Sequence, residues 1–169
     1  MAINSEPHIH NLVMCANIFI RRDDKFLVLK RSPNKTFAPG VVHPVGGKID
    51  PDEDPFTTAQ REVLEETGLT LKNMRLEAVL NELLPPPRHD YNWLIFHFTA
   101  DYESGEVAAT DEGELVWMTA DEIKASELFV SVRPVIEHML DPAVGTVFAT
   151  FAYDGDNIDL ARSTIQVCG

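Results

Sequence analysis

The stretch from Gly47 to Leu69, GKIDPDEDPFTTAQREVLEETGL, constrains this chain more than any other part of the sequence. Two Asp-Pro pairs, at 50–51 and 54–55, each offer an N-cap followed by a proline that suits the first turn of a helix. Gly68 is a favourable residue for ending a helix. The pattern therefore predicts a helix over residues 54–67.

Three glutamates lie close together on one side of this predicted helix. With 3.6 residues per turn, Glu62, Glu65 and Glu66 fall within about 100° of one another. Carboxylates this close repel one another unless a cation lies among them, and Mg²⁺ is a hard cation that binds such oxygens together with substrate phosphates. A solvated acidic face is the alternative interpretation, but it does not explain Glu53 and Arg61 at their fixed offsets. An apolar set on the neighbouring face is expected to anchor the helix: Phe56, Ala59 and Val63.

The spacing of the whole stretch is that of the Nudix box, G-x5-E-x7-R-E-U-x-E-E-x-G-U, in which U is aliphatic. The stretch matches this pattern at every fixed position, for which the chance at one place is about 10⁻⁹. The chain therefore resembles a Nudix hydrolase. The resemblance implies an α/β fold, an α/β/α sandwich with a central mixed β-sheet. It also implies metal-dependent cleavage of a diphosphate that is linked to a nucleoside or a similar group.

The resemblance assigns the acidic side chains of the box to metal binding and catalysis. Glu62 and Glu66 are the expected metal ligands, together with Glu65 and the backbone carbonyl of Gly46. The expected cofactor is Mg²⁺ or Mn²⁺. Glu65 is also a candidate for the catalytic carboxylate that takes a proton from water.

The remaining box residues are expected to have structural roles. Glu53 and Arg61 should form an internal salt bridge that holds the loop against the helix. Gly47 belongs to the turn before the helix, and Gly68 ends the helix.

Outside the box the resemblance suggests fewer residues. Glu112 occupies the place of a further acidic group, which would bind metal or act as a general base; an exposed acidic loop is the alternative. Arg31 and Lys48 are candidates for contacting a substrate phosphate, with a plain surface role as the alternative for each. The aromatic candidates for stacking on a base are Trp93, Phe37 and Trp117.

Length and composition favour one domain over residues 1–169, with a full core. A formal net charge of −13 disfavours a nucleic acid polymer as partner. The apolar run over residues 12–20 is too short to cross a membrane and follows no basic region of the kind found in signal peptides. Cys15 and Cys168 have neither metal-site nor disulfide spacing. We therefore expect a cytoplasmic protein that acts on a small molecule, with no membrane partner.

Periodicity and turn residues predict the other elements. Residues 1–10 are expected to form a flexible leader. Strands are predicted over residues 13–20, 26–29, 41–45, 75–84, 92–100 and 115–118, and helices over residues 120–125 and 132–140, with Pro134 in the first turn of the last helix.

Residues 144–169 are predicted to form an appended C-terminal β-hairpin. The turn signal DGDN at 154–157 separates two alternating segments. One face of the hairpin would be apolar: Val147, Phe151, Tyr153, Ile158, Leu160, Ile165 and Val167. Because a lone hairpin is marginal in water, this face should pack on the domain edge or on a second subunit, and a homodimer is expected.

The implied reaction is attack of water on a phosphorus atom of a diphosphate, assisted by a divalent cation. The first expected substrate is a nucleoside triphosphate or a related nucleoside diphosphate derivative, as in MutT-like members. These members read guanine with an asparagine that the corresponding residues 131–134 lack, which argues against 8-oxoguanine. The second is ADP-ribose or a nucleotide sugar, suggested by Pro85 after the box. A Nudix-fold ligand sensor without turnover is the alternative from another class.

Overall fold

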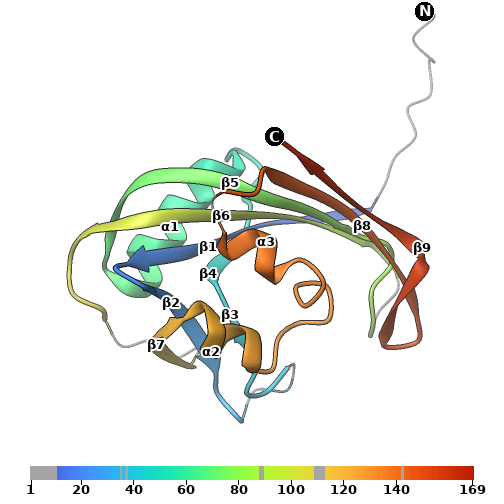
Figure 1. The fold of residues 1–169 in the computed structure, drawn as a ribbon, viewed down its shortest axis with the longest axis horizontal. Coiled ribbons are helices and arrows are strands. Elements are labelled where there is room, and N and C mark those ends of the chain that lie inside the picture. Colours follow the sequence, from blue (N-terminus) through green and yellow to red (C-terminus); the bar gives the residue numbers. More distant parts are fainter. Residues whose placement is uncertain (1–10, 35, 37, 88–89, 109–112, 142) are drawn as a thin grey trace, which may run out of the picture.

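The computed structural model of this chain describes residues 11–34, 36, 38–87, 90–108, 113–141 and 143–169. The described strands form one 9-stranded sheet, and helices pack on both of its faces (Figure 1). In chain order the elements are β1 (Leu12–Arg22), β2 (Lys25–Arg31), β3 (Val42–His43), β4 (Val45–Lys48), α1 (Pro55–Thr67), β5 (Thr70–Glu82), β6 (Asn92–Ser104), β7 (Gly113–Thr119), α2 (Ala120–Ala125), α3 (Ile136–Leu140), β8 (Thr146–Asp154) and β9 (Asn157–Cys168). The predicted leader, residues 1–10, lies outside the described residues.

The sheet is mixed, so the predicted fold class, an α/β/α sandwich, is confirmed. Its strand order is β3-β2-β1-β6-β5-β8-β9, with β4 also paired to β1 and β7 to β2. β1 runs parallel to β6, and β5 runs parallel to β8. The other pairs are antiparallel. The helix of the Gly47–Leu69 stretch, α1, connects β4 to β5 across one face of the sheet, opposite to α2 and α3 (Figure 1).

The apolar run near the N-terminus is a central strand that is buried on both faces. Successive side chains of a strand point to opposite sides. Ala16 and Ile18 of β1 pack in the cluster beneath α1, whereas Cys15 and Phe19 pack in the cluster beneath α2 and α3. Such a strand has a nearly continuous apolar sequence. None of the described helices combines the length and the apolar character that spanning a bilayer requires.

The predicted helix over residues 132–140 is wrong in its first half, because α3 begins at Ile136. The chain before it forms tight turns, in which the Val132 N–H donates to the Phe129 carbonyl at 3.0 Å. Pro134 has no N–H to donate, so it cannot extend a helix through this segment.

Two strand predictions also need correction. The strand predicted over residues 75–84 begins at Thr70, because its first residues continue to pair with β6 across bulges, and it ends at Glu82. The strand predicted over residues 41–45 is divided at Pro44 into β3 and β4. A proline cannot donate to a strand ladder, which accounts for this division.

The C-terminal hairpin extends the sheet of its own chain. β8 lies between β5 and β9, and Val147 and Phe151 on its inner face are fully buried. Leu160, Ile165 and Val167 of the edge strand β9 are exposed in this chain. The hairpin therefore contributes to the main hydrophobic core rather than forming a separate unit.

We predict that Phe151→Ala lowers the free energy of unfolding by about 3–5 kcal/mol, because it removes a buried aromatic ring and leaves a cavity. Phe148→Ala is the matched control, since Phe148 lies on the same strand but is 44% exposed; its effect should stay below about 1 kcal/mol. Urea denaturation of both variants gives the two values. Equal, small losses would show that the hairpin does not belong to the core.

His97 is a fully buried histidine on β6. Neither of its ring nitrogens has a hydrogen-bond partner among the described residues. Burial, and then the nearby His43, lower the pKa of His97 to about 3. Between its ordinary pKa of 6.5 and this value, the unfolded chain binds a proton that the folded chain does not. Stability is therefore lost as the pH falls through this window.

His97→Leu should remove this loss, because leucine fills an apolar site and does not titrate. Between pH 7 and pH 5, we expect the free energy of unfolding to fall by about 2 kcal/mol more in the wild type than in His97→Leu. Urea titrations at a series of pH values measure the difference. The same pH dependence in both proteins would contradict the assignment of His97 as a buried neutral group.

Candidate active site

The helix α1 begins and ends where its local sequence dictates. The Asp54 carboxylate accepts hydrogen bonds from the N–H groups of Phe56 and Thr57, at 2.8 and 3.0 Å. Gly68, with a φ of 72°, ends the helix in the left-handed conformation that glycine adopts without strain. Of the three predicted anchors, Ala59 and Val63 are fully buried, whereas Phe56 is half-exposed and contacts Phe98 edge-on. The helix thus presents its glutamates away from the core.

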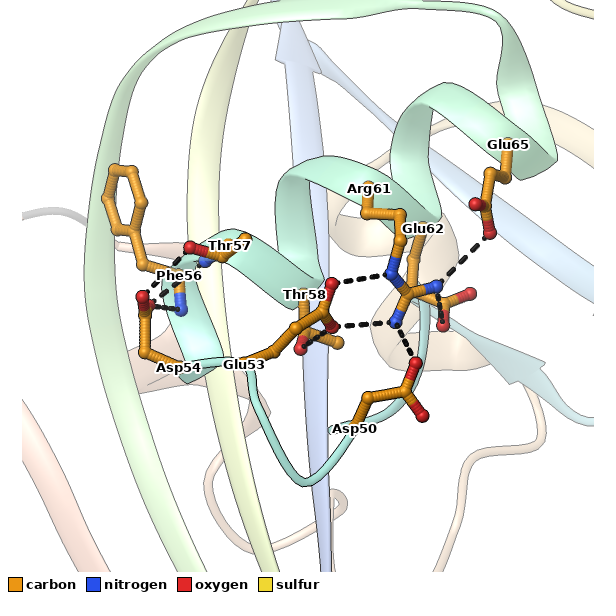
Figure 2. A network of polar contacts seen from close by, with 9 residues as sticks. All are labelled: Asp50, Glu53, Asp54, Phe56, Thr57, Thr58, Arg61, Glu62 and Glu65. Carbon is orange, nitrogen blue, oxygen red and sulfur yellow. Dashed lines mark hydrogen bonds and ion pairs between the residues drawn. The ribbon is translucent and has the colours of Figure 1, made fainter.

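Arg61 lies at the centre of a network of carboxylates (Figure 2). Its Nε and Nη2 donate to the two oxygens of Glu53, both at 2.9 Å, which is the expected internal salt bridge. Its Nη1 donates to Glu62 at 2.9 Å and to Glu65 at 3.1 Å. Asp50 approaches the same guanidinium at 3.9 Å. The Arg61 guanidinium therefore connects the loop before α1 to the acidic face of the helix.

Glu53 is held by more than the arginine. The Thr58 hydroxyl donates to Glu53 Oε2 at 2.6 Å. Hydrogen bonds from Arg61, and then from Thr58, lower the pKa of Glu53 from 4.5 to about 2. The carboxylate therefore stays ionised in the folded protein, and its contribution to stability is lost only as the pH falls from about 4.5 towards 2.

Gly47 makes room for the Glu62 carboxylate. A Cβ at residue 47 would lie 2.5 Å from Glu62 Cδ and 2.8 Å from Oε2, and closer still to Oε1. Gly46 is required for a different reason: its φ is 150°, and a side chain there would meet the Ala16 carbonyl and Asn17 Cα. The two glycines allow the turn to approach both the helix and β1, which leaves Glu62 with a side chain that is only 15% exposed.

The donor set suits a hard divalent cation. Glu62 provides a fixed, largely buried carboxylate, and Glu65 and Glu66 lie on the same helix within one turn of it. Oxygen donors of this kind are what Mg²⁺ prefers. Among the described residues, no three His, Cys, Asp or Glu side chains converge closely enough to hold a metal ion. In the structure Glu65, 59% exposed, is turned towards Arg61. Because an exposed glutamate changes rotamer readily, the residues fit the cation chemically.

The other candidates lie on neighbouring strands or outside the described residues. Lys48 ends β4, exposed and in register with Cys15 of β1. Arg31 ends β2 opposite Gly113 of β7. Glu112 and Phe37 lie outside the described residues. Trp93 is half-buried on β6, and Trp117 of β7 is covered by the Arg22 guanidinium, 4.1 Å from its ring centroid.

Sequence reasoning missed two members of the network, Asp50 and Thr58. Asp50 resembles an N-cap because a proline follows it, but Asp54 performs that role. Thr58 has no signal in the sequence, because a threonine on a helix commonly bonds to its own backbone. Only the folded loop before α1, which brings Asp50 to Arg61 and Glu53 to Thr58, shows what these two residues contact.

Comparisons with known proteins point to one family. The NUDIX domain family matches residues 12–139. The uncharacterised Nudix hydrolase YvcI of Bacillus subtilis is 29% identical over 139 residues, which are 81% of this chain and 84% of YvcI. The NAD-capped RNA hydrolase NudC of Klebsiella pneumoniae is 29% identical over 148 residues, 86% of this chain but 53% of NudC. The chain thus spans about half the length of NudC.

A solved structure has the same fold over most of the chain. The MutT protein of Bacillus halodurans matches with a TM-score of 0.75 and 23% identity, over 92% of this chain and 97% of that one. The chain therefore belongs to the Nudix family. It is a Nudix hydrolase, an enzyme that acts on phosphorus-containing acid anhydrides, so the family and enzyme class predicted from the box are confirmed.

The close approach of Gly47 to Glu62 can be tested with a double-mutant cycle. Gly47→Ala should lower the free energy of unfolding by about 1–3 kcal/mol, because the added methyl group displaces the carboxylate. In a Glu62→Ala background the same change should cost much less, since the obstructing carboxylate is gone. Thermal and urea denaturation of the four proteins measure the coupling. Additive effects would show that the two residues do not touch.

Proposed function

We propose that this chain is a Mg²⁺-dependent pyrophosphohydrolase that cleaves a diphosphate linkage in a nucleoside triphosphate or a related nucleoside diphosphate derivative. The observation that carries the proposal is the Glu62 carboxylate, which is held between Gly47 and Arg61 on the acidic face of α1. A largely buried carboxylate with one charged partner and more acidic groups beside it is suited to binding a cation. The family of hydrolases to which the chain belongs supports the reaction class.

The carboxylates of α1 and the glycine turn would bind the cation. Glu62 and Glu66, with Glu65 and the Gly46 carbonyl, would hold the cation, and Arg61 would keep Glu62 in position. A bound Mg²⁺ or Mn²⁺ lowers the pKa of water and neutralises charge on phosphate oxygens.

The proton and the phosphates would be handled by further side chains. Glu65, exposed and one helical turn from Arg61, or Glu112 would accept the proton from the attacking water. Lys48 and Arg31, at the ends of two strands, would contact substrate phosphates. Since the chain carries a net charge of −13, cations at the site rather than the overall field would have to attract a phosphorylated substrate.

The choice of substrate has two candidates. The MutT fold neighbour and the glycine turn favour a nucleoside triphosphate. NudC, by its name, acts on an NAD cap, which favours a substrate with a diphosphate between two groups, such as ADP-ribose or a nucleotide sugar. Incubation with a panel of both classes and Mg²⁺, followed by product analysis, distinguishes them. Binding without any turnover would instead support a ligand sensor.

The expectations about partners and location stay predictions. A small molecule, rather than a nucleic acid polymer or a membrane, is the proposed partner, and the cytoplasm is the proposed location. The homodimer would use β9, an edge strand to whose outer side no other described strand pairs and which carries exposed Leu160 and Val167.

Glu62→Gln and Glu66→Gln should each lower kcat by about 100-fold or more at saturating Mg²⁺, because the isosteric amide removes an anionic ligand. Glu114→Gln, on the exposed face of β7, is the control and should stay near the wild-type rate. EDTA should abolish turnover and added Mg²⁺ should restore it. A near wild-type rate in either test variant, or full activity after exhaustive metal removal, would refute the metal assignment.

A further inference from the structure

A second carboxylate, Glu82, is buried on the opposite face of the sheet from α1. It ends β5 and is only 8% exposed. The Tyr153 hydroxyl of β8 donates to Glu82 Oε2 at 2.9 Å. Burial raises the pKa of the Glu82 carboxyl, and hydrogen bonds from the Ser131 and Tyr153 side chains oppose this rise. Among the described residues, no lysine or arginine pairs with it. Burying a carboxylate with only neutral donors costs folding free energy, which suggests that Glu82 has a function other than stabilising the fold.

Glu77, on the same strand, is a buried carboxylate with a structural role and serves as a comparison for Glu82. It is 2% exposed, accepts a hydrogen bond of 2.5 Å from Thr99, and pairs with Arg75 at 3.4 Å. Its charge is therefore balanced by a cation within the same chain. Glu82 differs in this respect, because hydroxyl groups hold it without neutralising it. A carboxylate has about four acceptor positions, so two donors leave capacity for a ligand.

The surroundings of Glu82 suit a flat ring. In register, Glu82 lies opposite Trp93 of β6, and Trp93 lies opposite Val13 of β1. Trp93 and Val13 are half-buried, and the Tyr91 ring lies 6.2 Å from that of Trp93. A half-buried aromatic surface beside a buried acceptor is a combination that can bind an aromatic heterocycle with N–H donors.

A row of paired residues leads across the sheet from this region to β4, the strand that carries the glycine turn beside Glu62. The adjacent row of the sheet runs from Leu80 through Ile95 and Cys15 to Lys48 of β4. Burial first, and then Glu82 and Glu62, raise the pKa of Cys15 to about 12 against the opposing effect of Lys48. Three strand spacings of about 4.8 Å separate β5 from β4, a span that an extended nucleotide can bridge.

We infer that Glu82, positioned by Tyr153 and Ser131, selects the nucleobase of the substrate by accepting hydrogen bonds from adjacent ring N–H and amino groups, with the ring against Trp93. Guanine presents this pair of donors. Adenine presents one amino donor beside a ring nitrogen that is an acceptor, and the ionised Glu82 carboxylate would place a second acceptor against that nitrogen, which repels it. The inference rests on the proposed function for the location of the phosphates, and it gives the C-terminal hairpin a part in recognition through Tyr153.

The test compares guanine with adenine in the full-length chain. The wild type should hydrolyse GTP with a higher kcat/KM than ATP, and Glu82→Gln should lower the value for GTP about 10- to 100-fold while changing that for ATP less than about 3-fold. Glu77→Gln is the matched control, since it makes the same change at a buried site on the same strand, and it should leave the GTP/ATP ratio unaltered. Tyr153→Phe, which removes one hydroxyl, should reduce the ratio partially and covers the case in which Glu82→Gln does not fold.

A binding measurement separates this inference from the proposed function. Titration of GMP and AMP in EDTA, followed by the fluorescence of Trp93 and Trp117, requires no turnover. Tighter binding of GMP that Glu82→Gln abolishes would support the inference even if no nucleotide is hydrolysed. No preference for guanine in the wild type, or an unchanged ratio in Glu82→Gln or Tyr153→Phe, would overturn it even if hydrolysis is confirmed.

Discussion

The arrangement of the site on α1 depends on Arg61 and the carboxylates around it. Glu53 and Asp50 come from the loop before the helix, whereas Glu62 and Glu65 come from the helix itself. Without a cation between them these groups would repel one another, and the loop would have no charged attachment to the helix. Because Arg61 also bonds Glu62, the same contact fixes the carboxylate that lies against Gly47. A structural ion pair and a candidate metal ligand are thus parts of one network.

The central strand β1 connects the two faces of the molecule. Its alternate side chains pack under α1 on one side and under α2 and α3 on the other. Its partner β4 carries the glycine turn at the acidic helix face, and its partner β6 carries Trp93 beside Glu82. A substrate whose phosphates lie at one end of this arrangement and whose base lies at the other would cross the row that contains Cys15. In this view the sheet supplies the spacing between the two halves of the site, and the helices supply the reactive groups.

The C-terminal hairpin has a different structural role from the one that the sequence predicts. From the sequence it is an addition to a domain that is already complete. In the structure β8 lies inside the sheet, Phe151 belongs to the core, and Tyr153 reaches Glu82. A segment that supplies both core volume and a hydrogen bond to a buried carboxylate is integral to stability, and the proposed selection of the base would make it integral to recognition as well.

The sequence alone determined the box helix almost to the residue, because its start and end are encoded locally by Asp54, Pro55 and Gly68. It also determined the Glu53–Arg61 pair and the strands with strong alternation or continuous apolar character. What it could not determine depends on groups that are distant in the chain. The first residues of β5 become a strand only because β6 lies beside them, and α3 is shortened where the chain around Val132 and Pro134 forms tight turns. Asp50, Thr58 and Tyr153 carry no local signal for their partners. Tertiary structure decided these contacts, because a carboxylate finds its donors through the three-dimensional approach of strands and helices and not through spacing along the chain.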